Sequence, residues 1–163
     1  MPSSARRLLA AIVALSGVGI IVSGYGLWQH YAPVGTAFCN ISERFSCDIV
    51  NKSQWSEFFG IPVAAIGIVG FLALVALALV AYKHPPTGAP SELRFAVTLL
   101  LVLSLLGLIF QAALTAIELF IIGAACLICL TSQAIILGIA GCAIALYTQR
   151  VWIPADSTSP PSS

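Results

Sequence analysis

The residues best suited to chemistry in this sequence are its five cysteines, four of which form two closely spaced pairs. Cys39 and Cys47 are separated by seven residues, and Cys126 and Cys129 form a C-x-x-C motif. Two sulfurs at the latter spacing can close a disulfide, and the start of a helix stabilises an attacking thiolate. The two pairs together predict a relay of thiol–disulfide exchange. Cys142, in an apolar run, is interpreted as a small core residue.

Two other uses of these cysteines remain open. A static disulfide would account for Cys39 and Cys47, although it explains a tight pair inside an apolar run less well. A zinc site with four cysteine ligands is the second alternative, but the C-x7-C spacing differs from the usual ligand spacings. The spacing therefore favours a redox relay without a metal.

The elements that must position these cysteines are membrane helices. The chain has 163 residues, of which 60% are hydrophobic and only 8% are charged, against about 25% charged in an ordinary soluble domain. This composition excludes a soluble globular protein, and a net charge of +1 excludes a strongly basic nucleic-acid binder. The sequence predicts an all-α integral membrane protein, a bundle of four transmembrane helices. The expected spans are residues 8–27, 61–82, 95–117 and 123–147, joined between the first two by an outer loop at 28–60.

Local signals set the limits of these spans. Pro62 suits the first turn of a helix, and the Pro- and Gly-rich segment 83–94 is expected to be a loop. The apolar run 95–147 would be about 80 Å long as one helix, which is too long for a bilayer. We expect it to reverse between Ile117 and Gly123, because a charged Glu118 is unfavourable at the bilayer centre. Residues 1–153 are expected to form one membrane domain, followed by a disordered cytoplasmic tail at 154–163.

The basic residues predict how the bundle is oriented. Four spans place both termini on one side, together with five basic residues: Arg6, Arg7, Lys83, Arg94 and Arg150. The opposite side carries only Arg44 and Lys52. The positive-inside rule therefore predicts a multi-pass protein of the plasma (inner) membrane with cytoplasmic termini. Both cysteine pairs would then lie at the oxidising, extracytoplasmic face.

A relay that ends within a membrane needs an acceptor that is soluble in lipid, and a membrane quinone of the menaquinone or ubiquinone type meets this need. Uncharged side chains near the bilayer face could donate hydrogen bonds to a quinone carbonyl; the candidates are Ser53, Ser56 and Gln133, with Thr131 and Ser132 as further possibilities. Trp55, Phe58 and Phe59 are expected to be aromatic anchors of a short amphipathic turn that could cover the quinone pocket.

The motifs in their order resemble the vitamin K epoxide reductase family, in its bacterial branch. The resemblance covers about residues 8–147. It rests on the C-x7-C loop, on Ser53 six residues after Cys47, on the Phe-Gly-Ile-Pro sequence that ends at Pro62, and on the C-x-x-C motif.

The resemblance implies a four-helix bundle around a quinone and a separate thioredoxin-fold thiol oxidase as redox partner. Cys39 and Cys47 would be the shuttle pair that the partner reduces. Cys47 would then attack Cys126 of the Cys126–Cys129 disulfide and release Cys129 beside the quinone. Ser53 would hydrogen-bond near the quinone oxygen. The expected activity is quinone-dependent thiol oxidation that supports disulfide formation in exported proteins.

Two positions depart from the vertebrate members of this family. Gln133 and Ser56 stand where those members carry a tyrosine and an asparagine that are implicated in holding vitamin K. Simple quinone reduction is therefore favoured, and reduction of a quinone epoxide by the same cysteines is the alternative. A non-catalytic four-span subunit with a structural loop disulfide is a further alternative.

Four residues outside these motifs carry expectations of their own. Glu118 is expected either to cap the turn between the last two spans or to assist proton release. Gly19 and Ser23 form a small-xxx-small pair that would let a neighbouring helix approach closely. His30 is interpreted as a solvated loop residue.

Overall fold

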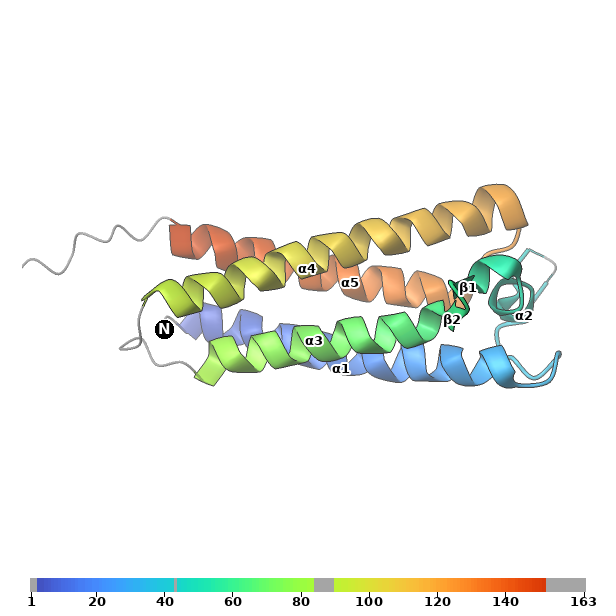
Figure 1. The fold of residues 1–163 in the computed structure, drawn as a ribbon, viewed down its shortest axis with the longest axis horizontal. Helices are drawn as coiled ribbons and strands as arrows, with labels where there is room; N and C mark the ends of the chain where they lie inside the picture. The colour runs from blue at the N-terminus through green and yellow to red at the C-terminus, as the bar shows by residue number, and fades with distance from the viewer. Residues whose placement is uncertain (1–2, 43, 84–89, 152–163) are drawn as a thin grey trace, which may run out of the picture.

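The computed structural model describes residues 3–42, 44–83 and 90–151, and its four long helices run side by side along one axis (Figure 1). They are α1 (Ser3–Tyr31), α3 (Val63–Lys83), α4 (Pro90–Ile117) and α5 (Leu127–Val151). Within the described ranges, four helical segments are long and apolar enough to cross a membrane, and they belong to these helices. The predicted all-α membrane bundle is confirmed.

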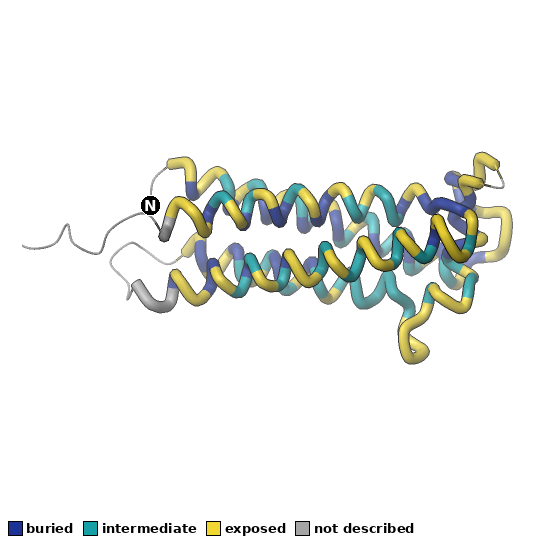
Figure 2. Tube along the Cα trace, turned by 90° about the horizontal axis from the view of Figure 1, so that it is seen from above, coloured by how far each residue is buried: buried dark blue, intermediate teal, exposed yellow. Residues whose placement is uncertain are grey.

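The four helices form a ring in which each packs against the next in the chain, and α1 closes the ring against α5. Their inner sides are apolar and fully buried at positions that include Leu9, Ile12, Leu74, Leu100, Ile139 and Leu146. Their outer sides also carry large apolar side chains, and more than half of the surface is exposed at Ile21, Val69, Leu106, Ile109 and Leu137 (Figure 2). Helices that are apolar on both sides suit a bundle surrounded by lipid.

Small residues bring α1 and α3 into close contact. Gly19 faces the ring of Phe71 so closely that a β-carbon at Gly19 would lie 2.6 Å from its Cε1 atom. One turn further along, a β-carbon at Gly67 would lie 3.0 Å from Ser23 Oγ. The small face that the sequence predicts at Gly19 and Ser23 therefore meets α3.

This contact leads to a first prediction. Gly19→Ala is expected to destabilise the bundle by about 1–3 kcal/mol, because the new methyl group overlaps the Phe71 ring and forces it to move. Gly17→Ala, on the same helix with nothing within 4 Å of the added carbon, is the matched control. Thermal unfolding of both variants in detergent checks the prediction, and equal melting temperatures would contradict it.

The segment between α1 and α3 folds over one end of the bundle, which we call the loop end (Figure 1). It contains α2 (Cys47–Asn51), the 3-10 turn η1 (Gln54–Ser56) and a hairpin of β1 (Glu57–Phe58) with β2 (Ile61–Pro62). The two-residue hairpin turn has positive φ at both Phe59 (53°) and Gly60 (76°), as a type I′ turn requires. The second long helix, α3, thus begins at Val63, two residues after the expected start, because Ile61 and Pro62 pair with β1.

The reversal between α4 and α5 also lies at the loop end. The backbone widens into a π-helical turn, η2 (Glu118–Ile122), and Gly123 ends it with a left-handed φ of 73°. Glycine adopts this conformation without strain. The turn lies where the sequence predicts it, but α5 starts only at Leu127, so that Cys126 precedes the helix and Cys129 lies in its first turn.

The opposite end of the bundle holds the start of α1, the end of α3 and the start of α4. The expected loop at 83–94 is shorter than predicted, because α4 begins at Pro90, where proline is favoured at a helix start. Residues 84–89 and the predicted tail at 154–163 lie outside the described residues.

Candidate redox site

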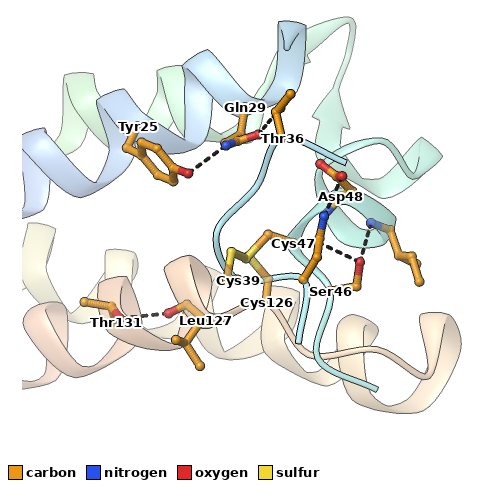
Figure 3. The surroundings of a disulfide bond; sticks show 12 residues. Tyr25, Gln29, Thr36, Cys39, Ser46, Cys47, Asp48, Cys126, Leu127 and Thr131 are labelled. Atoms are coloured by element: carbon orange, nitrogen blue, oxygen red, sulfur yellow. Dashed lines mark hydrogen bonds between the residues drawn. A yellow bond between two sulfur atoms is a disulfide. The ribbon is translucent and has the colours of Figure 1, made fainter. Parts of the chain in front are cut away.

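Three cysteines from distant parts of the chain meet at the loop end (Figure 3). Cys39 and Cys47 form a disulfide with a Cα–Cα distance of 5.7 Å, and Cys126 is a free thiol. The Cys126 Sγ atom lies 3.3 Å from Cys47 Sγ, although 79 residues separate the two. All three side chains are at most 1% exposed. A free thiol therefore contacts a disulfide in a site closed to solvent, which is the arrangement that thiol–disulfide exchange needs.

A polar network fixes the disulfide. Asn40, next to Cys39, donates from Nδ2 to Asp48 Oδ2 (2.7 Å) and accepts at Oδ1 from the backbone N–H of Asp48 (3.2 Å). The Asp48 carboxylate also accepts from the backbone N–H of Gly35 (2.5 Å). These bonds tie the chain before Cys39 to the first turn of α2.

Cys47 occupies the first position of α2, which Ser46 caps. Ser46 Oγ accepts from the backbone N–H of Ile49 (3.4 Å) and donates to Asn40 Oδ1 (3.0 Å). A serine cap satisfies a backbone N–H that would otherwise lack a partner and so stabilises the short helix. The cap and the Asn40–Asp48 bonds together hold both sulfurs of the disulfide in place.

Cys126 is held from two directions. The backbone N–H of Ala125 donates to the carbonyl of Arg44 (2.8 Å), which joins the α4–α5 link to the outer loop. The backbone N–H of Cys126 itself donates to Glu118 Oε2 (3.1 Å). A hydrogen bond with the Cys129 side chain lowers the pKa of the Cys126 thiol from its ordinary value, against the opposing effect of burial. A lowered pKa favours the thiolate, which is the reactive form.

Cys129 lies further into the bundle than the other three cysteines of the two pairs. It is half-buried in the first turn of α5, where its carbonyl accepts from Gln111 Nε2 of α4 (3.0 Å). Its side chain lines a cavity enclosed by all four long helices and the α2–η1 segment. The cysteines therefore lead from the outer loop, through Cys126, to this cavity.

The cavity beside Cys129 is mainly apolar, with a small set of hydrogen-bonding groups. The polar lining residues are Ser23, His30, Asn51, Ser53, Ser56, Gln111, Glu118 and Ser132. A second hollow between α3 and α4 continues from it, shares Phe71, Gln111 and Ser132 with it, and is otherwise lined by apolar residues and glycine. An apolar site with a few convergent polar groups is the usual kind of site for a small organic ligand.

Three of the quinone-binding candidates named from the sequence lie at this cavity: Ser53, Ser56 and the further candidate Ser132. Ser53 and Ser56 line it, and their hydroxyls donate to the carbonyls of Val50 (2.8 Å) and Ser53 (2.7 Å). Phe59 does not line the cavity, because it occupies the tip of the hairpin turn with 91% of its surface exposed. Gln133 is also absent from the lining, whereas its neighbour Ser132 is present.

The structure adds residues that the sequence interpretation missed. Gln111 lines both hollows. A polar amide within the apolar run of α4 is unusual, and this feature of the sequence could have identified Gln111 as a site residue. His30 is not a solvated loop residue: it lines the cavity, with Nδ1 2.8 Å from the carbonyl of Asn51 and Nε2 3.2 Å from Glu57 Oε1. Its position at the end of α1, facing the β1 hairpin, depends on tertiary packing.

Comparison with known families gives one finding. A family model described as the vitamin K epoxide reductase family matches residues 10–144. The matched range includes both cysteine pairs, the outer loop and the greater part of each long helix.

Proposed function

The chain belongs to the vitamin K epoxide reductase family, a family of oxidoreductases, and we propose that it is a quinone-dependent thiol oxidase that supports disulfide formation in exported proteins. A separate thioredoxin-fold protein would supply the electrons. A membrane quinone would receive them.

The observation that carries this proposal is the contact between Cys47 and Cys126. Exchange between two cysteine pairs requires one sulfur of each pair to meet, and these two are 3.3 Å apart. A loop disulfide with only a structural role has no need of a free thiol at this distance. The contact thus supports a relay over a static staple.

The relay consists of successive exchange steps. The partner's dithiol reduces the Cys39–Cys47 disulfide and becomes a disulfide itself. The Cys47 thiolate then attacks Cys126 of an oxidised Cys126–Cys129 pair, forms a mixed disulfide and releases Cys129. Cys39 next attacks Cys47, which restores the loop disulfide and leaves Cys126 and Cys129 as two thiols. That final state, with one disulfide and two free thiols, is the state that the structure describes.

The cavity suits the oxidant of this relay. A quinone supplies a two-electron acceptor with two carbonyl oxygens, and it needs apolar walls with a few donors. Gln111 has a second amide hydrogen beyond the one that it donates to the Cys129 carbonyl, and Ser53 and Ser56 add hydroxyl groups to the same lining. The apolar hollow between α3 and α4 would hold the hydrocarbon tail of such a molecule.

The bundle would lie in the plasma membrane with the loop end outside. Five of the seven basic residues lie at the opposite end, which favours the cytoplasm for that end. Reporter fusions test this orientation: alkaline phosphatase, active only outside the cytoplasm, is expected to be active when inserted after Gly35 and inactive after Gln149. The reverse pattern would contradict the orientation and would place the cysteines in a reducing compartment.

Anaerobic quinone reduction by the purified protein tests the activity itself. With a reduced thioredoxin-fold protein as donor, we expect one quinol for each disulfide formed in the donor. Protein whose thiols have been blocked with N-ethylmaleimide is the control and is expected to be inactive. Absence of quinol formation by the unblocked protein would overturn the proposal.

The same assay distinguishes quinone-dependent thiol oxidation from the alternative activity, reduction of a quinone epoxide. Quinone epoxide offered in place of quinone is expected to remain unreduced. Conversion of the epoxide with no reduction of the quinone would instead establish the vitamin K type of reaction.

A further inference from the structure

One ionisable side chain at the site has no part in the exchange steps described above. Glu118, in the π-helical turn, is only 3% exposed and lines the cavity together with Cys129. Its carboxylate accepts from the backbone N–H of Cys126 at 3.1 Å, three residues before Cys129 in the chain. The carboxyl group is therefore bonded to one member of the inner cysteine pair and shares a cavity with the other.

Capping alone does not explain a carboxylate in this place. The backbone N–H of Cys126 needs only an acceptor, which a neutral glutamine would provide. The turn itself is closed by the backbone, since the carbonyl of Glu118 accepts from the N–H groups of Gly123 and Ala124. Burial of an ionisable group is unfavourable in an apolar bundle, and such groups usually serve a function. A carboxylate, unlike an amide, can accept a proton.

From these contacts we infer that Glu118 is the proton acceptor for the Cys129 thiol when the inner pair is reoxidised. Cys129 Sγ–H gives its proton to the carboxylate, and the S–S bond of Cys126 and Cys129 forms as two electrons leave the pair for the quinone. The proton on Glu118 then passes to a quinone oxygen, and the thiol proton of Cys126 supplies the second. Two thiols and one quinone thus become one disulfide and one quinol, and Glu118 is again a carboxylate.

This inference rests on the proposed function for its direction of electron flow. The groups that face Glu118 are the backbone and thiol of Cys126, the thiol of Cys129 and, across the same cavity, the imidazole of His30. Among the described residues that line the cavity, His30, Glu118 and Cys129 are the titratable ones. Glu118 is the one of these whose side chain is hydrogen-bonded to Cys126.

Glu118→Gln tests the inference, because the amide keeps an acceptor for the Cys126 N–H and cannot take a proton. Quinone reduction by the prereduced protein is expected to fall about 10²-fold near neutral pH, as is typical for loss of a general base. The deficit should shrink as the pH rises, since hydroxide can replace the carboxylate. Glu92→Gln, which removes a carboxyl group near the start of α4 at the opposite end of the bundle, is the matched control and should show no pH-dependent deficit.

A second readout does not require quinone. The reduced, quinone-free protein is treated with iodoacetamide over a range of pH, and mass spectrometry follows the alkylation of Cys129. A carboxylate beside a thiol disfavours the thiolate, so alkylation of Cys129 should be about tenfold faster in E118Q than in the wild type over the pH range in which Glu118 is ionised. Alkylation of Cys142 in the same samples reports on the fold and should be equal in both proteins.

Identical pH profiles of Cys129 alkylation in the two proteins would overturn the inference and leave Glu118 with a capping role alone. Should E118Q fail to fold, Glu118→Asp decides instead, because the shorter side chain draws the carboxylate back from Cys129, and quinone reduction unchanged at every pH would contradict the inference. If the wild-type protein reduces no quinone while the two alkylation profiles differ as expected, the proposed function fails and the coupling of Glu118 to Cys129 stands.

Discussion

Replacing Cys47 with alanine is expected to abolish partner-driven quinone reduction, with a fall of at least about 10³-fold. Cys47 is the sulfur that connects the two pairs, since it is bonded to Cys39 and lies 3.3 Å from Cys126 Sγ. Without it, electrons delivered to the outer loop have no route to the cavity. Quinol formation with a reduced thioredoxin-fold donor measures the loss.

Two controls show that the loss concerns electron transfer and not folding. A small dithiol that enters the cavity can reduce the half-buried Cys129 end of the inner disulfide directly, so C47A should retain quinone reduction with this donor. Cys142→Ala, a change in the bundle core away from the relay, should leave both reactions unchanged. Full partner-driven activity in C47A would show that the relay bypasses the loop pair.

Cys129→Ser is expected to abolish quinone reduction with either donor and to trap the protein in a mixed disulfide. Cys126 then has no partner in its own pair, and its thiolate is left beside the loop disulfide. Attack on Cys47 forms a Cys47–Cys126 bond and releases Cys39 as a thiolate. Serine is a better replacement than alanine, because its hydroxyl can keep the hydrogen bond that favours the thiolate of Cys126.

Peptide mapping by mass spectrometry under acid quench identifies the trapped bond. The expected product is a disulfide-linked pair of peptides that contain Cys47 and Cys126, with Cys39 alkylated. A C129S protein with the Cys39–Cys47 bond unchanged over long incubation would argue that this disulfide is a static staple.

The membrane helices could be predicted from the sequence because lipid imposes a simple condition on them. Each span must be apolar over about twenty residues, and the chain meets this condition in runs that are easily located. The ends of the spans were less predictable. Ile61 and Pro62 are as apolar as the helix that follows, but they pair with Glu57 and Phe58 in a hairpin. Hydropathy cannot distinguish these two uses of the same residues.

The packing that brings the two pairs together could not be predicted in the same way. The resemblance implied that Cys47 meets Cys126, because it makes Cys47 the attacking sulfur, but it did not say how the outer loop packs on the α4–α5 link to bring them together. The hydrogen bond from the Ala125 N–H to the Arg44 carbonyl holds the two segments together. A backbone hydrogen bond of this kind does not depend on residue type, so it cannot be predicted from the sequence.

The predicted quinone-binding residues on α5 show that helical spacing can place a residue near the cavity but cannot decide which of two neighbours lines it. Ser132 and Gln133 follow Cys129 by three and four residues, and both spacings place a side chain near the same helix face. The neighbouring helices enclose only the part of that face that carries Ser132. For Phe59, aromatic character suggested a role at the pocket, but the hairpin turn directs this residue away from the bundle.

The burial of the loop disulfide has a consequence for selectivity. Because Cys39 and Cys47 are 1% and 0% exposed, a thiol in solution meets neither sulfur until the segment held by Asn40 and Asp48 opens. A thiol that collides at random waits for a rare local opening, whereas a docked protein can use its binding energy to stabilise the open segment. The loop would thus shield the outer pair from thiols that do not dock, so that only a dithiol small enough to enter the cavity could bypass it. Which protein dithiols are oxidised would then depend on docking, and not on reduction potential alone.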